Sequence, residues 1–512
     1  MKILTCLFIL VTLTTYAQPP IIPLPNQYEA VAGTFTLTDN TPIIVKEATF
    51  QAAGNYLQQE LLKRSGLRLA QQVTTSRPAI ILNRATLDKK GSYELSIHPQ
   101  TITISAGDEE GAFYGVISLL QLFAESRTTA CWTIKDTPLY GWRGFMLDES
   151  RHFFGIKKVK QLLDQMAYYK LNRFHWHLTD EPGWRIEIKQ YPRLTLIGGI
   201  GTTTDSLAAA QYYSQEEIKE IVRYAAERHI TVIPEIDMPG HATAANKAYP
   251  AYSGGGSMAH PEFTFNPGKE ETYQYLTNIL KEVDVLFPSQ MIHIGGDEVS
   301  FGNDKWLKDP SITKLMKEKN LKDVLAVEHY FLRRMADTII QRNNQILGWD
   351  EVTQAKLPVK NTLVFWWRHD HPEQLQAALE KNFQVVLCPR LPFYFDFVQD
   401  SLHIVGRKWA GKFNPLEAVY NFSADTYPGV KMHRNQIQGI QANLWTETIT
   451  SPTRLDFMIF PRLLALAEAA WTEKKNYQQF ESRLQKHVPF LKTEGMYFFN
   501  PRQPTQTPEP VH

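Results

Sequence analysis

Two adjacent carboxyl side chains, Asp297 and Glu298, follow a short apolar stretch and two glycines in the middle of the chain. Neighbouring residues inside a strand point to opposite faces, so they cannot both reach one ligand. Gly295 and Gly296 allow the strand to end, because glycine adopts backbone conformations that other residues resist. Both acids can then face one pocket, where burial and repulsion separate their pKa values and leave one acid as a proton donor. The alternative is a solvated turn, which the rest of the chain has to exclude.

The length and composition predict a soluble globular protein with more than one domain. A chain of 512 residues is too long for one ordinary domain, and 43% apolar with 21% charged residues is usual for globular proteins. The net charge of +1 provides neither the basic field that nucleic acid requires nor a polybasic patch for anionic lipid. The 11 tryptophans and 22 tyrosines supply flat amphipathic rings, which suit sugar faces. Because the net charge is close to zero, we expect no nucleic-acid partner.

Residues 1–17 have the pattern of a cleavable secretory signal. Lys2 precedes an apolar stretch over residues 3–13, and small residues end the segment. This stretch is too short to span a membrane, and no later stretch reaches the ~18 apolar residues that a membrane helix needs. We therefore expect a periplasmic or secreted protein without a membrane span. The mature chain keeps Cys131 and Cys388, which we expect to be buried free thiols rather than a disulfide.

Residues 18–137 combine short strands with two helical stretches. Two segments alternate in polarity around a Pro-Gln pair at residues 99–100, which is typical of a hairpin. No group of titratable residues forms a candidate site here, so we predict a small α+β domain. The expected strands cover residues 34–37, 42–45, 79–82, 91–97 and 101–105, and the expected helices cover residues 50–65 and 109–125.

From residue 138 the pattern changes to short apolar runs separated by helical stretches. Such alternation predicts parallel strands that are buried on both faces. Eight runs predict an α/β fold, a closed (β/α)8 TIM barrel over residues 138–490, with a tail over residues 491–512. The expected strands cover residues 143–149, 173–178, 230–236, 291–294, 346–349, 362–367, 384–388 and 438–444.

Acidic and aromatic residues recur at the ends of these strands. In a TIM barrel the catalytic groups lie at the carboxyl ends of the strands. A single residue of this kind is more often structural than functional, whereas recurrence at successive strand ends is hard to obtain by chance. The strand ends carry Asp148, Asp180, His241, Asp297, Glu298, Trp349, Asp350, Trp367, Tyr394, Asp396, Trp445 and Glu447.

A barrel mouth with acids and tryptophans suits the hydrolysis of glycosides. Aromatic rings stack on sugar faces, charged side chains bind hydroxyl groups, and a carboxylic acid protonates the leaving oxygen. Ordinary glycosidases place two carboxyl groups across the scissile bond, and adjacent residues such as Asp297 and Glu298 cannot do so. The pair instead suits a substrate that brings its own nucleophile, a 2-acetamido oxygen that attacks C1 beside a stabilising carboxylate.

Several multi-residue motifs recur along the barrel region. They are Trp142-Arg143-Gly144 with Asp148-Glu149-Ser150-Arg151-His152, His175-Trp176-His177-Leu178-Thr179-Asp180, Pro234-Glu235-Ile236-Asp237-Met238-Pro239-Gly240-His241, His293 to Glu298, Gly348 to Glu351, Tyr394 to Asp396, and Asn443 to Glu447. In this order they resemble the motifs of the family 20 glycoside hydrolases, the β-N-acetylhexosaminidases. The resemblance covers essentially the whole mature chain, since that family also has a small α+β domain before its barrel. A shared barrel alone would not indicate the family.

The resemblance implies an exo-acting, retaining β-N-acetylhexosaminidase that removes terminal GlcNAc or GalNAc from an oligosaccharide or glycoconjugate. It implies no metal or organic cofactor. By the resemblance Glu298 is the general acid and base, Asp297 orients the acetamido group, and Tyr394 donates to the acetamido oxygen. The implied substrate-site residues are Arg143, Asp396 and Glu447 for hydroxyl groups, Trp349, Trp367 (chosen over Trp366 from the family pattern) and Trp445 for the acetamido methyl and the sugar face, and Asp180 with His241 as the pair that supports the acid.

Two other classes of protein stay open at this point. His175 and His177 at a strand end, with His241 and an aspartate, are also how a metal-dependent amidohydrolase begins its site. The structural alternative for these histidines is a hydrogen-bond network. A non-catalytic sugar-binding protein would have lost one of the two acids at positions 297 and 298, and both are present. The residues expected to be barrel-mouth structure are Asp148, Arg151, His152, Glu235 and Asp237.

Overall fold

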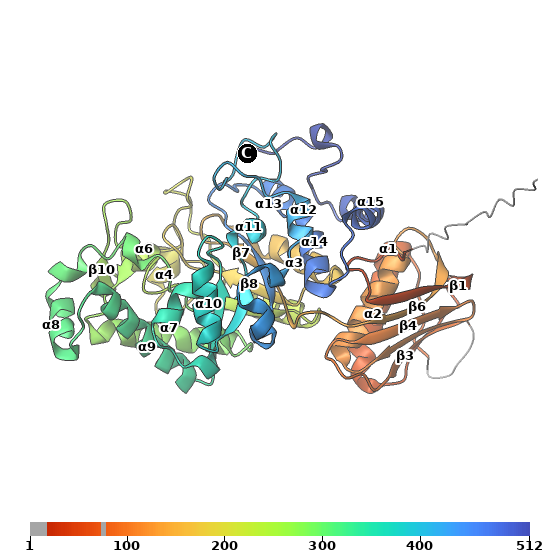
Figure 1. Cartoon of the computed structure of the whole chain (residues 1–512), viewed down its shortest axis with the longest axis horizontal. Helices are drawn as coiled ribbons and strands as arrows, with labels where there is room; N and C mark the ends of the chain where they lie inside the picture. Colours follow the sequence, from red (N-terminus) through yellow and green to blue (C-terminus); the bar gives the residue numbers. More distant parts are fainter. Residues whose placement is uncertain (1–17, 73–77, 512) are drawn as a thin grey trace, which may run out of the picture. The chain divides into compact units, whose positions relative to one another are not determined.

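The computed structural model describes residues 18–72 and 78–511 (Figure 1). The chain divides into two compact units, Met1–Thr137 and Pro138–His512. The expected secretory signal at residues 1–17 lies outside the described residues. Among the helices of the described chain, none has both the length and the apolarity needed to cross a membrane.

The described residues of the first unit form a six-stranded sheet and two helices. Its elements are β1 (Gln27–Thr36), β2 (Ile43–Val45), β3 (Ala79–Arg84), β4 (Tyr93–His98), β5 (Thr101–Ala106), β6 (Thr128–Asp136), α1 (Gln51–Ser65) and α2 (Glu109–Leu122), with a 3-10 turn, η1 (Ala48–Phe50). The strand order is β1-β6-β4-β5-β3-β2, and the antiparallel pair β4 and β5 is the predicted hairpin. Helix α2 packs on both of these strands, and Asp108 caps it by accepting from the Gly111 N–H. Strand β6 is not predicted from the sequence.

The second unit is built on a closed parallel barrel of eight strands, which confirms the predicted (β/α)8 architecture. The strands are β7 (Trp142–Asp148), β8 (Arg173–His177), β9 (Thr231–Glu235), β12 (Met291–His293), β13 (Gln345–Trp349), β14 (Thr362–Trp366), β15 (Gln384–Leu387) and β16 (Ile437–Leu444). They follow one another around the barrel in chain order, and β16 closes it by pairing with β7. All eight correspond to the predicted apolar runs, and their carboxyl ends share one rim.

Helices and short connections surround this barrel. The helices are α3 (Gly155–Tyr168), α4 (Arg193–Leu196), α5 (Gln215–Ala226), α6 (Thr243–Ala248), α7 (Glu270–Leu286), α8 (Pro310–Lys319), α9 (Val324–Gln341), α10 (Pro372–Glu380), α11 (Arg390–Phe393), α12 (Leu416–Tyr420), α13 (Pro452–Ile459), α14 (Arg462–Trp471) and α15 (Tyr477–Thr493). The loop after α6 contains a short antiparallel pair, β10 (Ser253–Gly255) and β11 (Thr264–Phe265). Short 3-10 turns include η3 (Val299–Phe301) and η5 (Asp350–Gln354), which follow β12 and β13.

Local sequence signals explain why these helices form and which side they bury. Helix α5 begins with a capping box in which Ser214 and Glu217 each bond the other's backbone N–H. Its apolar residues Ile218, Ile221 and Ala225 recur at helical spacing and are buried. Other helices carry apolar residues at the same spacing and pack with them on the barrel. The barrel strands are therefore buried on both faces. The cysteines at positions 131 and 388 are buried and free, as predicted.

Candidate active site

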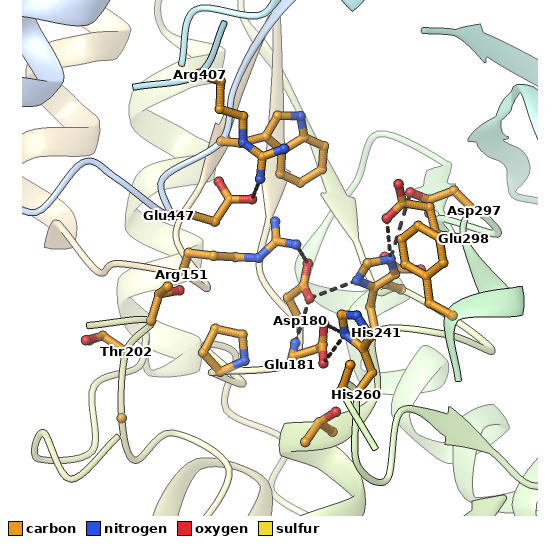
Figure 2. Close-up of a pocket in the computed structure, with 18 of the residues that line it drawn as sticks. Arg151, Asp180, Glu181, Thr202, His241, His260, Asp297, Glu298, Arg407 and Glu447 are labelled. Carbon is orange, nitrogen blue, oxygen red and sulfur yellow. Dashed lines mark hydrogen bonds and ion pairs between the residues drawn. The ribbon is translucent and has the colours of Figure 1, made fainter. Parts of the chain in front are cut away.

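A cavity of about 1040 Å³ opens at the carboxyl ends of the barrel strands (Figure 2). Its wall includes residues that follow β7, β8, β9, β12, β14, β15 and β16, so most of the strands contribute to it. The predicted site residues on this wall are Asp180, His241, Asp297, Glu298, Trp367, Tyr394, Trp445 and Glu447. Three other predicted site residues do not lie on this wall: Arg143, Trp349 and Asp396.

The backbone after β12 presents Asp297 and Glu298 to the same cavity. Gly295 and Gly296 have φ angles of 65° and 85°, in the left-handed region that favours glycine. A Cβ atom at Gly295 would lie 1.8 Å from Oδ1 of Asp237, so no larger residue fits there. Glu298 itself adopts a φ of 54°. This turn leaves Asp297 8% exposed and the Glu298 side chain 32% exposed, both on the cavity wall.

The carboxyl group of Asp297 lies in a buried and acidic environment. Burial, together with the charges of Asp237 and Glu298, raises its pKa well above the ordinary value of 3.8, although His241 acts in the opposite direction. Within the described chain, Oδ1 of Asp297 has no hydrogen-bond partner. A positive charge that formed beside this group would stabilise the ionised carboxylate, so the site favours a cationic intermediate.

His241 connects the acidic pair to a buried network of charges (Figure 2). Its Nε2 lies 3.7 Å from Oε2 of Glu298 and 3.9 Å from Oδ2 of Asp297. Its Nδ1 lies 3.0 Å from Oδ1 of Asp180, and the Arg151 guanidinium lies 2.7 Å from Oδ2 of that carboxylate. Burial lowers the pKa of His241, but the nearby carboxylates outweigh burial and raise this pKa well above its usual value. His241 is therefore a cation whose Nε2–H faces both acids.

The same network continues into the barrel interior as far as Glu235. His177 lies between two carboxylates, with Nε2 2.8 Å from Oδ2 of Asp180 and Nδ1 2.5 Å from Oε2 of Glu235. The indole N–H of Trp349 donates to Oε1 of Glu235 at 3.0 Å. Although burial would raise the pKa of Glu235, the surrounding histidines hold it well below its usual value. Negative and positive side chains therefore alternate from Glu235 through His177 and Asp180 to His241. This network holds the His241 ring beside the two acids.

Two arginines flank strand β7, and only one of them reaches the cavity. Arg143, the predicted ligand of sugar hydroxyl groups, is 1% exposed at the start of the strand and donates to the carbonyl oxygens of Tyr140 and Lys170. This prediction is wrong, because the amino end of a barrel strand lies at the opposite end from the site. Arg151, predicted to be structural, lines the cavity with its guanidinium 5.0 Å from the ring centroid of Trp445.

Aromatic rings cover one side of the cavity. The rings of Trp367 and Tyr394 have centroids 6.2 Å apart and planes 11° apart, and the Trp445 ring also lies 6.2 Å from Tyr394. Trp366, the neighbour considered for the same strand, is buried away from this wall. Trp349 is 1% exposed and lies 5.9 Å from Trp445. It lies against the ring layer with its indole N–H bound to Glu235 in the barrel interior, and its predicted contact with the ligand stays a prediction.

Asp396 and Glu447 lie beside Arg407 at another side of the cavity. Oε1 of Glu447 lies 2.6 Å from the Arg407 guanidinium on the wall (Figure 2). Asp396 is buried 3.6 Å from Arg407, and within the described residues neither of its carboxyl oxygens has a hydrogen-bond partner. Burial, with the charge of Glu447, raises the pKa of Asp396 to about 7. An unsatisfied buried carboxyl group is costly, so Asp396 is suited to a hydroxyl group that reaches it from the cavity.

The wall also contains residues that the sequence patterns did not single out. The rings of His260 and Phe301 stack with centroids 5.7 Å apart, and Nδ1 of His260 lies 2.9 Å from Oε1 of Glu181. Arg407 and Trp409 come from the long connection between β15 and β16. These residues belong to loops, where no hydrophobic period marks a residue as facing inward. A search for charged and aromatic neighbours in long loops after barrel strands would have selected Arg407 and Trp409.

The histidine pair on β8 belongs to a hydrogen-bond network in the barrel interior. Nδ1 of His175 lies 3.0 Å from the side-chain amide of Gln441, and its Nε2 lies 3.0 Å from Oε2 of Glu235. Burial lowers the pKa of His175 to about 4, so the ring is neutral at physiological pH. His175, Glu235 and His293 are close enough to share an ion. The carboxylate is already bound to His177 and to an indole, so the geometry favours the structural alternative over an amidohydrolase centre.

The fold and the wall together define the class of this enzyme. A (β/α)8 barrel that brings a pair of adjacent carboxyl groups, charged hydroxyl-binding groups and aromatic rings to its carboxyl rim is the framework of a glycoside hydrolase. Residues 140–474 match the model of the glycosyl hydrolase family 20 catalytic domain, and residues 18–137 match domain 2 of the same family. The chain belongs to glycosyl hydrolase family 20.

Individual relatives agree with this family. A β-hexosaminidase of Porphyromonas gingivalis is 35% identical over 94% of this chain, which spans 64% of the length of that relative. A β-hexosaminidase of Vibrio furnissii is 36% identical over 89% of this chain and 77% of its own length. Among solved structures, a family 20 exo-β-N-acetylglucosaminidase of Vibrio harveyi, in complex with N-acetylglucosamine, has a TM-score of 0.87 at 35% identity and covers 94% of this chain and 78% of its own.

Proposed function

We propose that this protein is an exo-acting β-N-acetylhexosaminidase that removes terminal, non-reducing GlcNAc or GalNAc from oligosaccharides or glycoconjugates with retention of configuration. The family and the named activities of its relatives support this activity. The observation that carries the proposal is the adjacent pair Asp297 and Glu298 on one cavity wall. Carboxyl groups on neighbouring residues suit a reaction in which the substrate supplies the nucleophile, because they cannot stand on opposite sides of the scissile bond.

In the first step the oxygen of the 2-acetamido group attacks C1 while the bond from C1 to the leaving oxygen breaks. Glu298 gives its proton to that oxygen, so the leaving group departs as an alcohol and Glu298 becomes a carboxylate. The sugar becomes an oxazolinium ion, and its positive charge favours the ionised form of Asp297, which releases its proton and offsets that charge. In the second step Glu298 takes a proton from water as the water attacks C1, which restores the acetamido group and the acid.

The other residues of the site bind and orient the sugar. Tyr394 donates its hydroxyl hydrogen to the acetamido oxygen, and Trp367 and Trp445 enclose the acetamido methyl group and the sugar face. The cationic side chain of Arg151 and the carboxylates of Asp396 and Glu447 bind sugar hydroxyl groups, in line with their positions at or behind the wall. His241 and Asp180 act through the acids rather than on the sugar, because Asp180 is enclosed by its own ion pairs.

A panel of 4-nitrophenyl glycosides tests the proposed chemistry. We expect the β-N-acetylglucosaminide or the β-N-acetylgalactosaminide to be hydrolysed, and the corresponding β-glucoside to react at least about 10⁴-fold more slowly, because it lacks the internal nucleophile whose positioning provides most of the rate. The first sugar product, observed by NMR, should be the β anomer. Comparable hydrolysis of the plain glucoside, or an α product, would contradict the substrate-assisted mechanism.

The two arginines at the ends of β7 offer a matched comparison. We expect Arg151→Gln to lower kcat/KM by about 10–100-fold, because the loss of a charged hydrogen-bonding group on the wall weakens the hold on both Asp180 and the sugar. Arg143→Gln should leave kcat/KM of the folded enzyme within about threefold and instead lower its thermal stability, since buried carbonyl groups lose their donors. Steady-state kinetics and thermal denaturation on both variants separate these roles; the reverse pattern would restore Arg143 as the sugar ligand.

We also propose a periplasmic or secreted location. The charged start, apolar stretch and small residues of residues 1–17 support it. Expression of the full chain and N-terminal sequencing of the exported protein test this location. Retention of residues 1–17 on a protein found in the cytosol would contradict it.

A further inference from the structure

A second, smaller cavity of about 370 Å³ adjoins the acidic pair. It shares Glu298, Phe301 and Trp367 with the main cavity, and the rest of its wall comes from η3, η5, the residue after Trp367 and the start of α9. None of the groups proposed to bind the terminal sugar, apart from Trp367, lies on this wall. Glu298, the proposed proton donor to the leaving oxygen, lies on both walls, so the second cavity offers a place for a leaving group that extends past this acid.

An unpartnered carboxyl group faces this second cavity. Glu328 on α9 is 8% exposed and lines the cavity, and within the described chain its carboxyl group has no hydrogen-bond or ion-pair partner. Burial raises its pKa to about 7. A buried carboxyl group without a partner is costly, and the cost is removed when a ligand supplies a donor or a positive charge.

By formal count the second cavity is acidic, with Glu298, Glu328 and Glu351 against one arginine, and burial together with the charge of Asp350 raises the pKa of Glu351 to about 8. The Arg368 guanidinium is bound to Asp350, with Nε 2.6 Å from Oδ1, and lies 3.4 Å from Oε1 of Glu351. Burial lowers the pKa of His329, so this ring carries no charge at neutral pH. The single arginine is thus already paired with two acids, and no cation on the wall is left for Glu328.

The acids of the second cavity are spread out rather than grouped. In the described part of the chain, the sets of three or more side chains close enough to hold a metal ion do not include Glu298, Glu328 or Glu351. An extended organic ligand with one cationic group fits this arrangement better than a small ion does. A primary ammonium group is compact, carries three donors, and pairs with carboxylates.

We infer that the second cavity is a subsite for leaving groups that carry a primary ammonium group, with Glu328 as its carboxylate partner, and that the enzyme therefore accepts a glucosamine unit next to the terminal N-acetylhexosamine. The inference rests on the proposed function, because it concerns the leaving group of that reaction. The chemical class of substrate that it adds is a partly de-N-acetylated β-linked amino-sugar oligosaccharide.

The test compares two disaccharides that differ only in the leaving unit, GlcNAc-β-1,4-GlcN and GlcNAc-β-1,4-GlcNAc. The measured quantity is the ratio of kcat/KM for the amine over that for the acetamide at neutral pH. For Glu328→Gln we expect this ratio to fall about tenfold or more relative to the wild type, because an uncharged amide loses the charge-assisted bond. The ratio is taken on one preparation, so it does not depend on the fraction of the variant that folds.

Asp337→Asn is the matched control, because Asp337 is an exposed acid on the same helix and lies outside the second cavity. It should keep the wild-type ratio. A fall of more than about fivefold in Glu328→Gln alone supports the subsite, and a smaller change, or an equal change in Asp337→Asn, overturns it. Hydrolysis of 4-nitrophenyl N-acetyl-β-glucosaminide by the wild type reports separately on the proposed function, so its absence would reject that function and not the subsite alone.

Discussion

Replacement of Glu298 by glutamine is expected to lower kcat/KM for a natural disaccharide such as N,N'-diacetylchitobiose by about 10²–10⁴-fold, the usual contribution of a positioned general acid or base. The sugar alcohol is a poor leaving group and needs a proton as the bond breaks, which an amide cannot supply. Glutamine keeps the size of the side chain, so the turn at φ 54° and the fold should persist. Steady-state kinetics on the purified variant measure the loss.

The leaving group distinguishes loss of the acid from general damage to the site. With 4-nitrophenolate, which departs without protonation, the bond-breaking step of Glu298→Gln should lose far less than it loses with the disaccharide. Glu318→Gln, the same change at an exposed glutamate, should behave like the wild type with both substrates. Equal losses with both leaving groups would show that Glu298 does not act as the proton donor.

The barrel could be predicted because its strands leave a strong signal in the sequence. Each parallel strand is buried on both faces, so it reads as a short apolar run between helical stretches. Strand β6 of the first unit gives no such signal. Its buried residues Cys131, Trp132 and Ile134 stand between threonines and a lysine, and its place in the sheet is set by pairing with β1 and β4 rather than by its own composition.

The choice between the arginines at positions 143 and 151 could have been made from the sequence by applying the polarity of the barrel. Arg143 is the second residue of its strand and Arg151 follows the strand's end, and only the carboxyl end of a strand carries sites in this fold. The family motif contained both arginines, and the motif alone did not say which one reaches the sugar.

The positions of Trp349 and Asp396 could not be derived in this way. Trp349 ends strand β13, and whether its side chain faces the cavity or the barrel interior depends on a single residue of register, which boundary predictions do not resolve. Asp396 lies in the connection after β15 and α11, where no strand period indicates the direction of a side chain. In the structure the indole of Trp349 is committed to Glu235, a contact between residues that are far apart in the sequence. The charge network that ends at His241 likewise depends on long-range contacts and leaves no periodic signal.

Replacement of Asp297 by asparagine is expected to lower kcat for acetamido sugars by about 10²–10³-fold, the cost of removing one preorganised electrostatic group from a buried site. Asparagine can still accept a hydrogen bond from the acetamido N–H, but it cannot offset the positive charge of the intermediate. The same change should stabilise the empty protein. Burial and the neighbouring acids Asp237 and Glu298 make the ionised form of Asp297 costly, which is why its pKa lies well above 3.8.

The raised pKa of Asp297 also predicts how the difference in stability between Asp297→Asn and the wild type changes with pH. Above pH 3.8 the unfolded wild type releases the Asp297 proton while the folded protein keeps it, so the contribution of this group to stability is lost as the pH rises from 3.8 to the folded-state pKa. Asparagine does not titrate. The thermal midpoint of Asp297→Asn should therefore exceed that of the wild type by a margin that widens from about pH 4 upward until the folded-state pKa is reached. A margin that stays flat or narrows over this range, or a kcat within about tenfold of the wild type, would mean that Asp297 is not a buried carboxyl group that ionises when a positive charge forms beside it.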